Sequence, residues 1–206
     1  MEPIDIEGIA DIADSHARSH GHFWVFGYGS LMWNPGFPYE ESRHAVLPGF
    51  HRSFCVRSTV YRGTPQQPGL VLGVDVGGEC NGMAFRVPAA QRDEVLAYLF
   101  EREMRAYVYI PTWVSVAIDG AAAPALTFVV KRDHRQFVCM TEDEMVAIIA
   151  SSAGENGSNY EYLENTVHAL HELGVNDPAL DALHERVFAH LDSAGTVAGN
   201  SPIAET

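Results

Sequence analysis

Two features of this sequence carry the residue types needed for chemistry. The first is a glycine-rich turn at residues 27–30, Gly-Tyr-Gly-Ser, which directly follows four large apolar residues at 23–26. A buried strand that ends in such a turn often brings backbone N–H groups against an anionic ligand. The dinucleotide fingerprint needs a third glycine where this chain has Met32, and no Lys-Ser/Thr pair follows the turn. We therefore expect an anion smaller than a nucleotide.

The second feature is Glu103, at the end of a helix predicted over residues 88–103. Steps of three, four and seven residues from Leu96 follow the apolar face of this helix and end at Glu103, whereas Glu101 lies on the outer face. Burial and the negative end of the helix dipole both raise a carboxyl pKa, so Glu103 is a candidate proton shuttle. The alternative is a buried structural ion pair with one of three arginines: Arg52, Arg57 or Arg102.

The elements that must position these residues fall into a strand-rich part and a helical part. Strand-like stretches are expected near residues 23–28, 50–60, 69–76, 81–87, 107–118 and 125–131. Turn signals such as Gly77-Gly78 and Asp119-Gly120 separate them. Six strands with a single helical interruption predict a small barrel or a strongly curled sheet rather than alternating βαβ units.

The last third of the chain has a helical period. Thr141 and Ser158 are each followed three residues later by glutamate, which predicts two capping boxes. Gly174 is expected to end the second helix, and Asp177-Pro178 to begin a third. Before the strands, residues 1–20 predict a weakly amphipathic surface helix, with apolar positions Ile4, Ile6, Ile9 and Ile12.

Composition limits the class of partner and the compartment. The chain has 13 Lys+Arg against 27 Asp+Glu, a net charge of −14, which argues against nucleic acid or an anionic membrane as partner. The three cysteines, Cys55, Cys80 and Cys139, show no CxxC spacing and are expected to be buried and inert, as in a reducing compartment. Without a leader or an apolar run of spanning length, we expect a soluble cytoplasmic protein.

Five motifs extend the prediction from local features to a family. They are YGSLMWNPGF at 28–37, GFHRSF at 49–54, YRGTPQQPGLVLG at 61–73, YLFERE at 98–103 and NYEYL at 159–163. In this order they resemble the ChaC-like γ-glutamylcyclotransferase family, in the branch that acts on glutathione. The resemblance runs from about residue 23 to 187. It divides the chain into an N-terminal extension (1–22), a cyclotransferase-like domain (23–192) and a flexible tail (193–206).

The resemblance implies an α+β fold, a small β-barrel flanked by helices with a helical C-terminal third. It also implies cleavage of reduced glutathione into 5-oxoproline and Cys-Gly, with no metal or organic cofactor. In such proteins the last glutamate of the YLxxRE motif is the acid/base, which here is Glu103. The YGSL turn holds the γ-glutamyl group, and further motif positions line or support the site. The substrate-binding set carried over is Gly27, Tyr28, Gly29, Ser30, Leu31, Arg52, Ser58, Arg62 and Tyr162.

The charges and the turn add two finer expectations. Because the acidic chain repels anions, a cluster of Arg52, Arg57 and Arg62 is expected to receive the glycine carboxylate of the substrate. A side chain at Gly29 is expected to occupy the space of the α-carboxylate and to resist a positive φ. The motif GFHRSF departs from the family pattern, because His51 and Ser53 flank Arg52 where a pair of arginines is more usual.

Several alternatives stay open at the level of sequence. Instead of binding substrate, Tyr162 could be a half-buried aromatic residue at helical spacing, and Arg62 could only shape a turn. The substrate could be another γ-glutamyl amine or amino acid, or the chain could be a non-catalytic γ-glutamyl-binding module. A metal site is the weakest alternative, on histidines with i, i+4, i+6 spacing: His16, His20 and His22. The sequence does not predict the oligomeric state.

Overall fold

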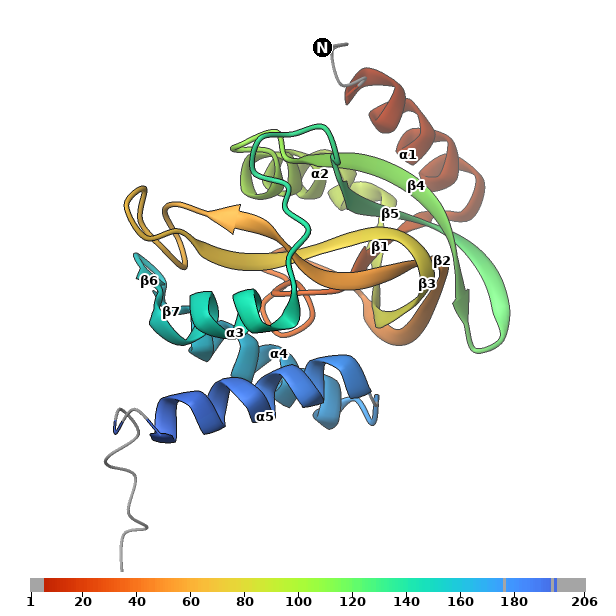
Figure 1. The fold of residues 1–206 in the computed structure, drawn as a ribbon. Coiled ribbons are helices and arrows are strands. Elements are labelled where there is room, and N and C mark those ends of the chain that lie inside the picture. The colour runs from red at the N-terminus through yellow and green to blue at the C-terminus, as the bar shows by residue number, and fades with distance from the viewer. Residues whose placement is uncertain (1–5, 176, 194, 196–206) are drawn as a thin grey trace, which may run out of the picture.

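The strand-rich part of the chain closes into a five-stranded barrel in the computed structural model, which describes residues 6–175, 177–193 and 195 (Figure 1). The strands are β1 (His22–Gly27), β2 (Glu41–Ser58), β3 (Gly69–Pro88), β4 (Tyr109–Ile118) and β5 (Ala121–Val130). Their spatial order is β1-β3-β2-β4-β5. Parallel pairing of β1 with β5, at Trp24 and Ala125, closes the barrel and confirms the predicted architecture.

The prediction of two separate strands at 69–76 and 81–87 is wrong, because β3 runs through both as one strand. Gly77 and Gly78 have positive φ angles of 113° and 68°, yet they do not reverse the chain. They lie where the β2–β3 register shifts between Pro48 and Phe50, opposite Gly49, which has a φ of 81°. The glycines therefore allow an irregularity that bends the long β2–β3 ribbon into the barrel instead of ending a strand.

The turn at Asp119-Gly120 is a true hairpin turn, as predicted. The two residues have φ angles of 50° and 80° and join β4 to β5. Positive φ at both central positions is the type I′ geometry that matches the twist of the flanking strands.

The interior of the barrel is aromatic and aliphatic. Among the described residues, its largest fully buried side chains include Phe23, Phe26, Phe85, Phe128, Leu70 and Leu126. Each such side chain stabilises the fold by about 1.5–3 kcal/mol relative to exposure. Near the β1–β5 seam, the Thr127 hydroxyl donates a hydrogen bond of 3.0 Å to the carbonyl of Phe26. The strand that leads into the glycine turn is therefore held on both edges and by the core.

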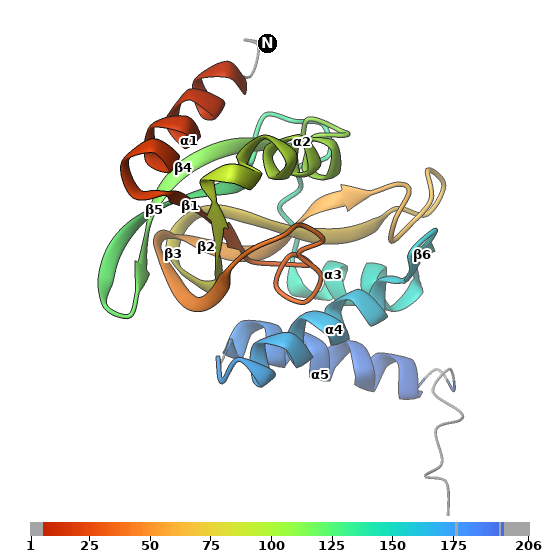
Figure 2. The same cartoon turned by 180° about the vertical axis from the view of Figure 1, so that it is seen from behind.

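Helices α1 (Ile6–His20) and α2 (Arg92–Glu103), the latter preceded by the short helix η1 (Ala89–Gln91), lie on one side of the barrel (Figure 2). Helix α1 packs against the barrel through Ala13 and Ala17, while Ile6 and Ile12 are exposed. The predicted surface helix is confirmed, and of its named isoleucines Ile9 is partly buried against the core, whereas Ile4 lies outside the described residues. The fully buried positions of this helix are alanines, which allow its backbone to approach the barrel closely.

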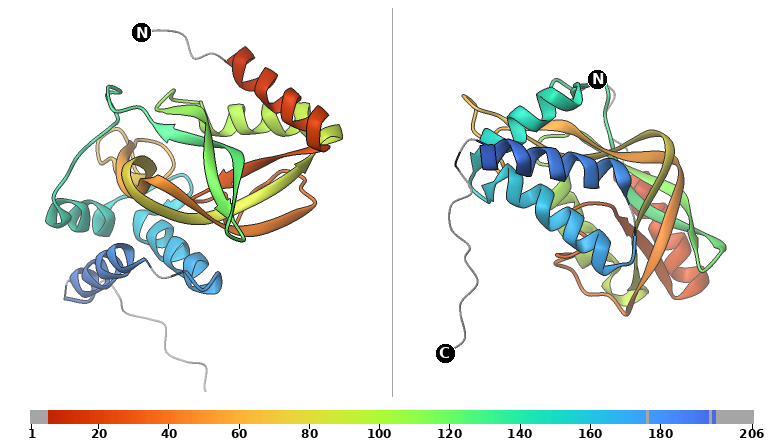
Figure 3. Two further views of the ribbon diagram at one scale, coloured as in Figure 1. Left: turned by 90° about the vertical axis from the view of Figure 1, so that its right-hand side faces the viewer. Right: turned by 60° about the horizontal axis from the view of Figure 1, so that its bottom comes forward.

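Helices α3 (Glu142–Ser151), α4 (Asn159–Glu172) and α5 (Pro178–Ser193) lie on the opposite side of the barrel (Figure 3). A two-stranded ribbon, β6 (Ala153–Gly154) and β7 (Gly157–Ser158), leads into α4. The predicted helices are confirmed, with a full capping box at Thr141 and a positive φ at Gly174 just after α4. At Ser158 the side chain accepts from the N–H of Glu161, whose carboxylate lies 3.4 Å from Arg62.

The cysteines divide into two classes. Cys55 and Cys80 are buried, and burial raises the pKa of their thiols to about 12 and about 11. Cys139 is exposed, so the prediction that all three are buried is wrong. In the described part of the chain, no helix combines the length and the apolar character needed to span a bilayer. Of the tail at 193–206, only residues 193 and 195 are described.

Candidate active site

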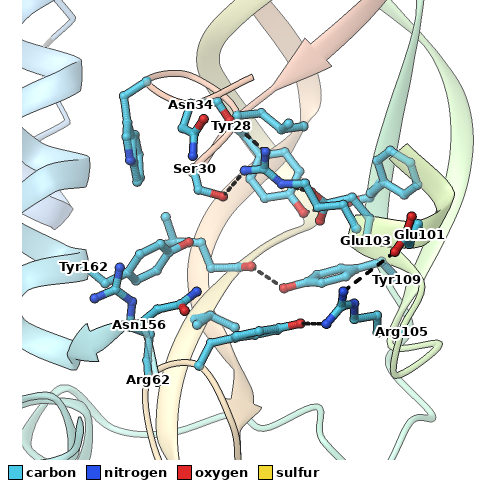
Figure 4. A pocket seen from close by; sticks show the side chains of 18 of the residues that line it. Tyr28, Ser30, Asn34, Arg62, Glu101, Glu103, Arg105, Tyr109, Asn156 and Tyr162 are labelled. Atoms are coloured by element: carbon cyan, nitrogen blue, oxygen red, sulfur yellow. Dashed lines mark hydrogen bonds and ion pairs between the residues drawn. The ribbon is translucent and has the colours of Figure 1, made fainter. Parts of the chain in front are cut away.

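A cavity of about 530 Å³ opens where the glycine turn, the end of α2 and the first turn of α4 meet (Figure 4). A volume of this size suits a small organic ligand. The cavity brings together seven residues predicted for the site: Tyr28, Gly29, Ser30, Leu31, Arg62, Glu103 and Tyr162. They come from four segments that are far apart in the sequence, and the barrel supplies the common frame.

The glycine turn is a compact loop that leaves backbone donors available. The N–H of Met32 donates to Gly29 and that of Asn34 donates to Ser30, at 2.8 and 2.9 Å. Within the described residues, the N–H groups of Gly29, Ser30 and Leu31 donate to no protein acceptor. The turn therefore offers three backbone donors on residues that line the cavity, as an anion site requires.

The two glycines of the turn are required by close approach and not by a positive φ, so that part of the expectation for Gly29 is wrong. A Cβ at Gly27 would lie 2.8 Å from the Cβ of Leu31. A Cβ at Gly29 would lie 3.3 Å from the hydroxyl oxygen of Tyr162. Gly27 thus lets the turn fold back on itself, and Gly29 keeps room beside Tyr162.

Glu103 is the last residue of α2, and its carboxylate lies toward the cavity (Figure 4). Its side chain is 18% exposed. Burial raises the pKa of this carboxyl, and the nearby Arg102 guanidinium acts in the opposite direction. The predicted helix phase is confirmed by the burial of Val95, Leu96 and Leu99 on the same helix.

Arg102 is the ion-pair partner that the sequence left as one of three alternatives. Its Nε lies 3.2 Å from the Glu103 carboxylate. Its other nitrogens bind the glycine turn, with donation to the Ser30 hydroxyl at 2.9 Å and to the Asn34 carbonyl at 2.7 Å. A further hydrogen bond of 2.9 Å joins it to the Tyr98 hydroxyl one helical turn earlier. Arg102 therefore fixes the turn and the candidate acid/base relative to each other.

Tyr162 reaches the cavity because α4 is anchored at its first residue. The Asn159 side chain exchanges two hydrogen bonds with the backbone of Leu70 in β3, at 2.6 and 2.7 Å. Tyr162 follows one turn later and is buried, which raises the pKa of its phenol to about 12. The charge of Glu103 adds to this rise and that of Arg62 opposes it, so the phenol lies within the electrostatic reach of both groups.

Two more tyrosines complete the wall beside Glu103. The Tyr28 hydroxyl donates to the Phe128 carbonyl, and the Tyr109 hydroxyl donates to the Leu72 carbonyl, both at 2.7 Å. Burial raises the pKa of both phenols above their ordinary value. These side chains are therefore neutral at physiological pH and enclose the carboxyl without adding charge.

Three residues of the predicted substrate-binding set do not line the cavity: Gly27, Arg52 and Ser58. The Arg52 side chain is only 2% exposed. It donates a hydrogen bond of 2.6 Å to the Tyr28 carbonyl and forms an ion pair of 2.8 Å with Asp177. The Ser58 hydroxyl accepts a hydrogen bond from the backbone N–H of Arg62 at 3.1 Å. Arg52 and Ser58 therefore each lie behind a residue of the cavity wall and support it.

The expected arginine cluster of Arg52, Arg57 and Arg62 is wrong, because only Arg62 lines the cavity and Arg57 is exposed elsewhere on β2. Arg105, which sequence reasoning did not assign to the site, lines the cavity instead, and so do Tyr61 and Asn156. The sequence does give one indication that Arg105 lies near the site, because this residue follows the YLxxRE motif by two positions. Its position depends on how the chain leaves α2, which helical phase does not predict.

The histidines proposed for a metal site pack with aromatic rings. His16 lies 5.1 Å from Trp113, between ring centroids, and His22 lies 5.8 Å from Trp24. Within the described part of the chain, no three His, Cys, Asp or Glu side chains converge as a metal site would require.

Comparisons with known proteins point in one direction. The model of the family described as ChaC-like protein matches residues 23–190. The glutathione-specific gamma-glutamylcyclotransferase of Escherichia coli K12 is 39% identical over 165 residues, which cover 79% of this chain and 71% of that protein. The human glutathione-specific gamma-glutamylcyclotransferase 1 is 31% identical over 180 residues, which cover 84% and 79%.

Among solved structures, the yeast gamma-glutamyl cyclotransferase specific to glutathione superposes with a TM-score of 0.76. It is 26% identical in sequence, and the match covers 83% of this chain and 97% of the yeast chain. The barrel and the helices that carry the candidate site are thus shared with a protein of that description.

Proposed function

The chain belongs to the ChaC-like protein family, and we propose that it is a γ-glutamylcyclotransferase that cleaves reduced glutathione into 5-oxoproline and Cys-Gly. The observation that carries the proposal is the joint placement of Glu103 and the glycine turn on one cavity, linked by Arg102. We assign the activity to residues 23–192, with residues 1–22 as an extension. The buried free thiols of Cys55 and Cys80 are in keeping with a reducing compartment such as the cytoplasm.

The first task of the site is to fold the substrate. The α-amine and the γ-carbonyl of a γ-glutamyl group belong to one molecule, so their reaction avoids most of the entropic cost of bringing two reactants together. The free N–H groups of Gly29, Ser30 and Leu31 bind the α-carboxylate. This holds the glutamyl arm in the bent conformer that closes a five-membered ring.

The second task is proton transfer. The α-ammonium has no lone pair until it loses a proton, and the departing amine of Cys-Gly must gain one. The Glu103 carboxylate accepts the first proton and returns it to the leaving amine. The second proton that the ring nitrogen loses is taken up by the released Cys-Gly amine, which leaves as an ammonium. A raised pKa suits both steps, because the carboxylate is then a stronger base when it accepts the proton, and the carboxyl keeps that proton at a higher pH than an ordinary glutamic acid until the leaving amine takes it. Such catalysis is typically worth about 10²–10⁴-fold in rate.

The third task is to stabilise the negative charge that develops on the γ-carbonyl oxygen when the amine attacks the γ-carbon. The neutral Tyr162 hydroxyl, next to Gly29, is the side-chain donor available on this side of the cavity. A donor held in place before the reaction stabilises the developing charge without reorganisation. In this scheme neither a nucleophilic side chain nor a cofactor is needed, because the substrate supplies its own nucleophile.

Product analysis tests this function directly. Purified protein is incubated with reduced glutathione, oxidised glutathione, γ-glutamyl-alanine and γ-glutamyl-lysine, and 5-oxoproline is quantified by mass spectrometry. We expect 5-oxoproline and Cys-Gly in equal amounts from reduced glutathione, and the highest kcat/KM for it. A preference for γ-glutamyl-alanine or the lysine compound would instead favour a broader cyclotransferase. Absence of 5-oxoproline from all four would leave a γ-glutamyl-binding module.

A further inference from the structure

The wall of the cavity away from the glycine turn carries two arginines that the mechanism does not use. They are Arg62, from the loop after β2, and Arg105, just beyond α2. In Figure 4 both lie along the edge of the cavity that faces away from Ser30 and Asn34, with Glu103 and Tyr162 between the two edges. The chain carries a net charge of −14, and each arginine has a glutamate nearby, Glu161 beside Arg62 and Glu101 beside Arg105, so this edge attracts an anion only through guanidinium nitrogens that these glutamates do not occupy.

Arg62 is held in place but keeps donors free. Its side chain is 14% exposed, and its guanidinium lies 5.3 Å from the ring centre of Tyr162. One nitrogen, Nη1, donates to the Ser158 carbonyl at 3.0 Å and lies 3.4 Å from Glu161. Among the described residues, Nε and Nη2 donate to no protein acceptor. These two nitrogens form the planar fork that a carboxylate binds best.

The loop that carries Arg62 is rigidly joined to its neighbour. The backbone N–H groups of Glu155 and Asn156 donate to the carbonyls of Val60 and Tyr61, each at 2.9 Å. The Asn156 side chain lines the same edge of the cavity. The arrangement around Arg62 is therefore built by backbone pairing and does not depend on a mobile surface side chain.

Arg105 completes the edge from the other side. Its Nη1 donates to the Tyr61 hydroxyl at 2.8 Å, and its Nη2 lies 3.9 Å from Glu101. Both members of this ion pair are largely exposed, with side-chain exposures of 61% and 79%. Such a pair is worth little and is readily exchanged for a ligand carboxylate.

We propose that Arg62 and Arg105 form a subsite for a second substrate carboxylate, the one on the glycine residue of glutathione. The inference rests on the proposed function, which places the α-carboxylate in the glycine turn and the scissile amide beside Glu103. A Cys-Gly unit that extends from the scissile amide ends about two residue lengths away, roughly 7 Å, and carries its charge at the far end. Two arginines at that edge select γ-glutamyl peptides with a terminal carboxylate over γ-glutamyl amines.

Binding to an inactivated protein tests the subsite separately from turnover. Full-length Glu103→Gln protein is titrated by calorimetry with reduced glutathione and with its glycine monoethyl ester, in which only the second carboxylate is capped. We expect the ester to bind about 10- to 100-fold more weakly, the loss typical of a charge-assisted hydrogen bond. In the same background, Arg62→Gln and Arg105→Gln should weaken glutathione binding and leave the ester nearly unchanged. Arg18→Gln, on exposed α1, should leave both affinities and their ratio unchanged.

The outcomes separate the subsite from the proposed function. If neither arginine substitution reduces the preference for glutathione over the ester, or if glutathione does not bind, the subsite is wrong. Equal weakening of both probes also overturns it, because that pattern reports general damage to the cavity. If the preference follows the arginines but wild-type protein forms no 5-oxoproline, the proposed function is wrong and the subsite stands.

Discussion

Replacement of Arg102 with glutamine should change the pH dependence of the reaction as well as its rate. The guanidinium Nε lies 3.2 Å from the Glu103 carboxylate, and both side chains are only about one-fifth exposed, at 20% and 18%. Burial raises the pKa of Glu103 and Arg102 opposes the rise. Without the guanidinium, the pKa of Glu103 should therefore climb further, and less of the carboxylate form is present at neutral pH.

The size of the effect follows from the contacts that are lost. An opposite charge at this distance typically moves a carboxyl pKa by about one unit or more, so the acidic limb of kcat/KM should move to higher pH by about that amount. Above the limb, the hydrogen bonds to Ser30 and Asn34 are also missing. Bonds to a charged group contribute about 1.5–3 kcal/mol each, although water replaces part of them. We expect a remaining loss of about 10- to 100-fold.

Initial rates of 5-oxoproline formation from glutathione, measured from acidic to alkaline pH, give the profile. Arg92→Gln is the matched control, because it removes the same charge from the start of α2, where Arg92 pairs with Asp14 and Asp93. Its acidic limb should coincide with that of the wild type. A profile for Arg102→Gln that falls in height without moving along the pH axis would refute the claim that Arg102 sets the pKa of Glu103.

Four further outcomes follow from the same site. Glu103→Gln should lower kcat by at least about 10²–10⁴-fold, and Glu185→Gln, an exposed glutamate on α5, should not; near wild-type turnover by the first variant would exclude Glu103 as the acid/base. The pKa of Glu103 is raised in the folded state, so its contribution to stability is present at acidic pH and is lost as the pH rises through that pKa. Glu103→Gln should therefore melt at a higher temperature than wild type in alkaline buffer but not in acidic buffer. Gly29→Ala should weaken binding of an unreactive γ-glutamyl analogue, because the new Cβ would lie 3.3 Å from the Tyr162 hydroxyl oxygen and narrow the space beside the turn; unchanged affinity in a folded variant would contradict a role for Gly29 in the site. Arg52→Met should lower the free energy of unfolding in urea by about 3–5 kcal/mol, because Asp177 and the Tyr28 carbonyl lose a buried partner, and a loss below about 1 kcal/mol would contradict that reading.

The periodic parts of the fold could be predicted from the sequence because their signals are local. The phase of α2 and the cap at Thr141 depend on residues within one or two turns, and both are confirmed. The prediction of a turn at Gly77-Gly78 is wrong because a glycine pair permits a reversal or a bulge equally well. Only the partner strand, with its own irregularity at Gly49, decides between them.

The site shows the same division between local and long-range information. Glu103 and the glycine turn were identifiable because an apolar stripe and a strand–turn boundary are visible in one segment. The expected arginine cluster failed because strand neighbours in sequence, such as Arg57, alternate between faces and diverge in space. Arg52 is turned toward Asp177, which is 125 residues away in the chain. Pairings over that separation leave no pattern in a single sequence.

The adjacency of Arg102 and Glu103 explains how one helix end can both build and tune the site. Consecutive helical residues point about 100° apart, so one side chain can reach the glycine turn while the next faces the cavity. Glu103 also stands at the C-terminus of α2, where the negative end of the helix dipole disfavours a carboxylate in the same sense as burial does. Arg102 opposes the effect of burial from its position at the turn. Any displacement of the turn that moved Arg102 would therefore change the acidity of Glu103, so substrate positioning and proton transfer depend on a single side chain.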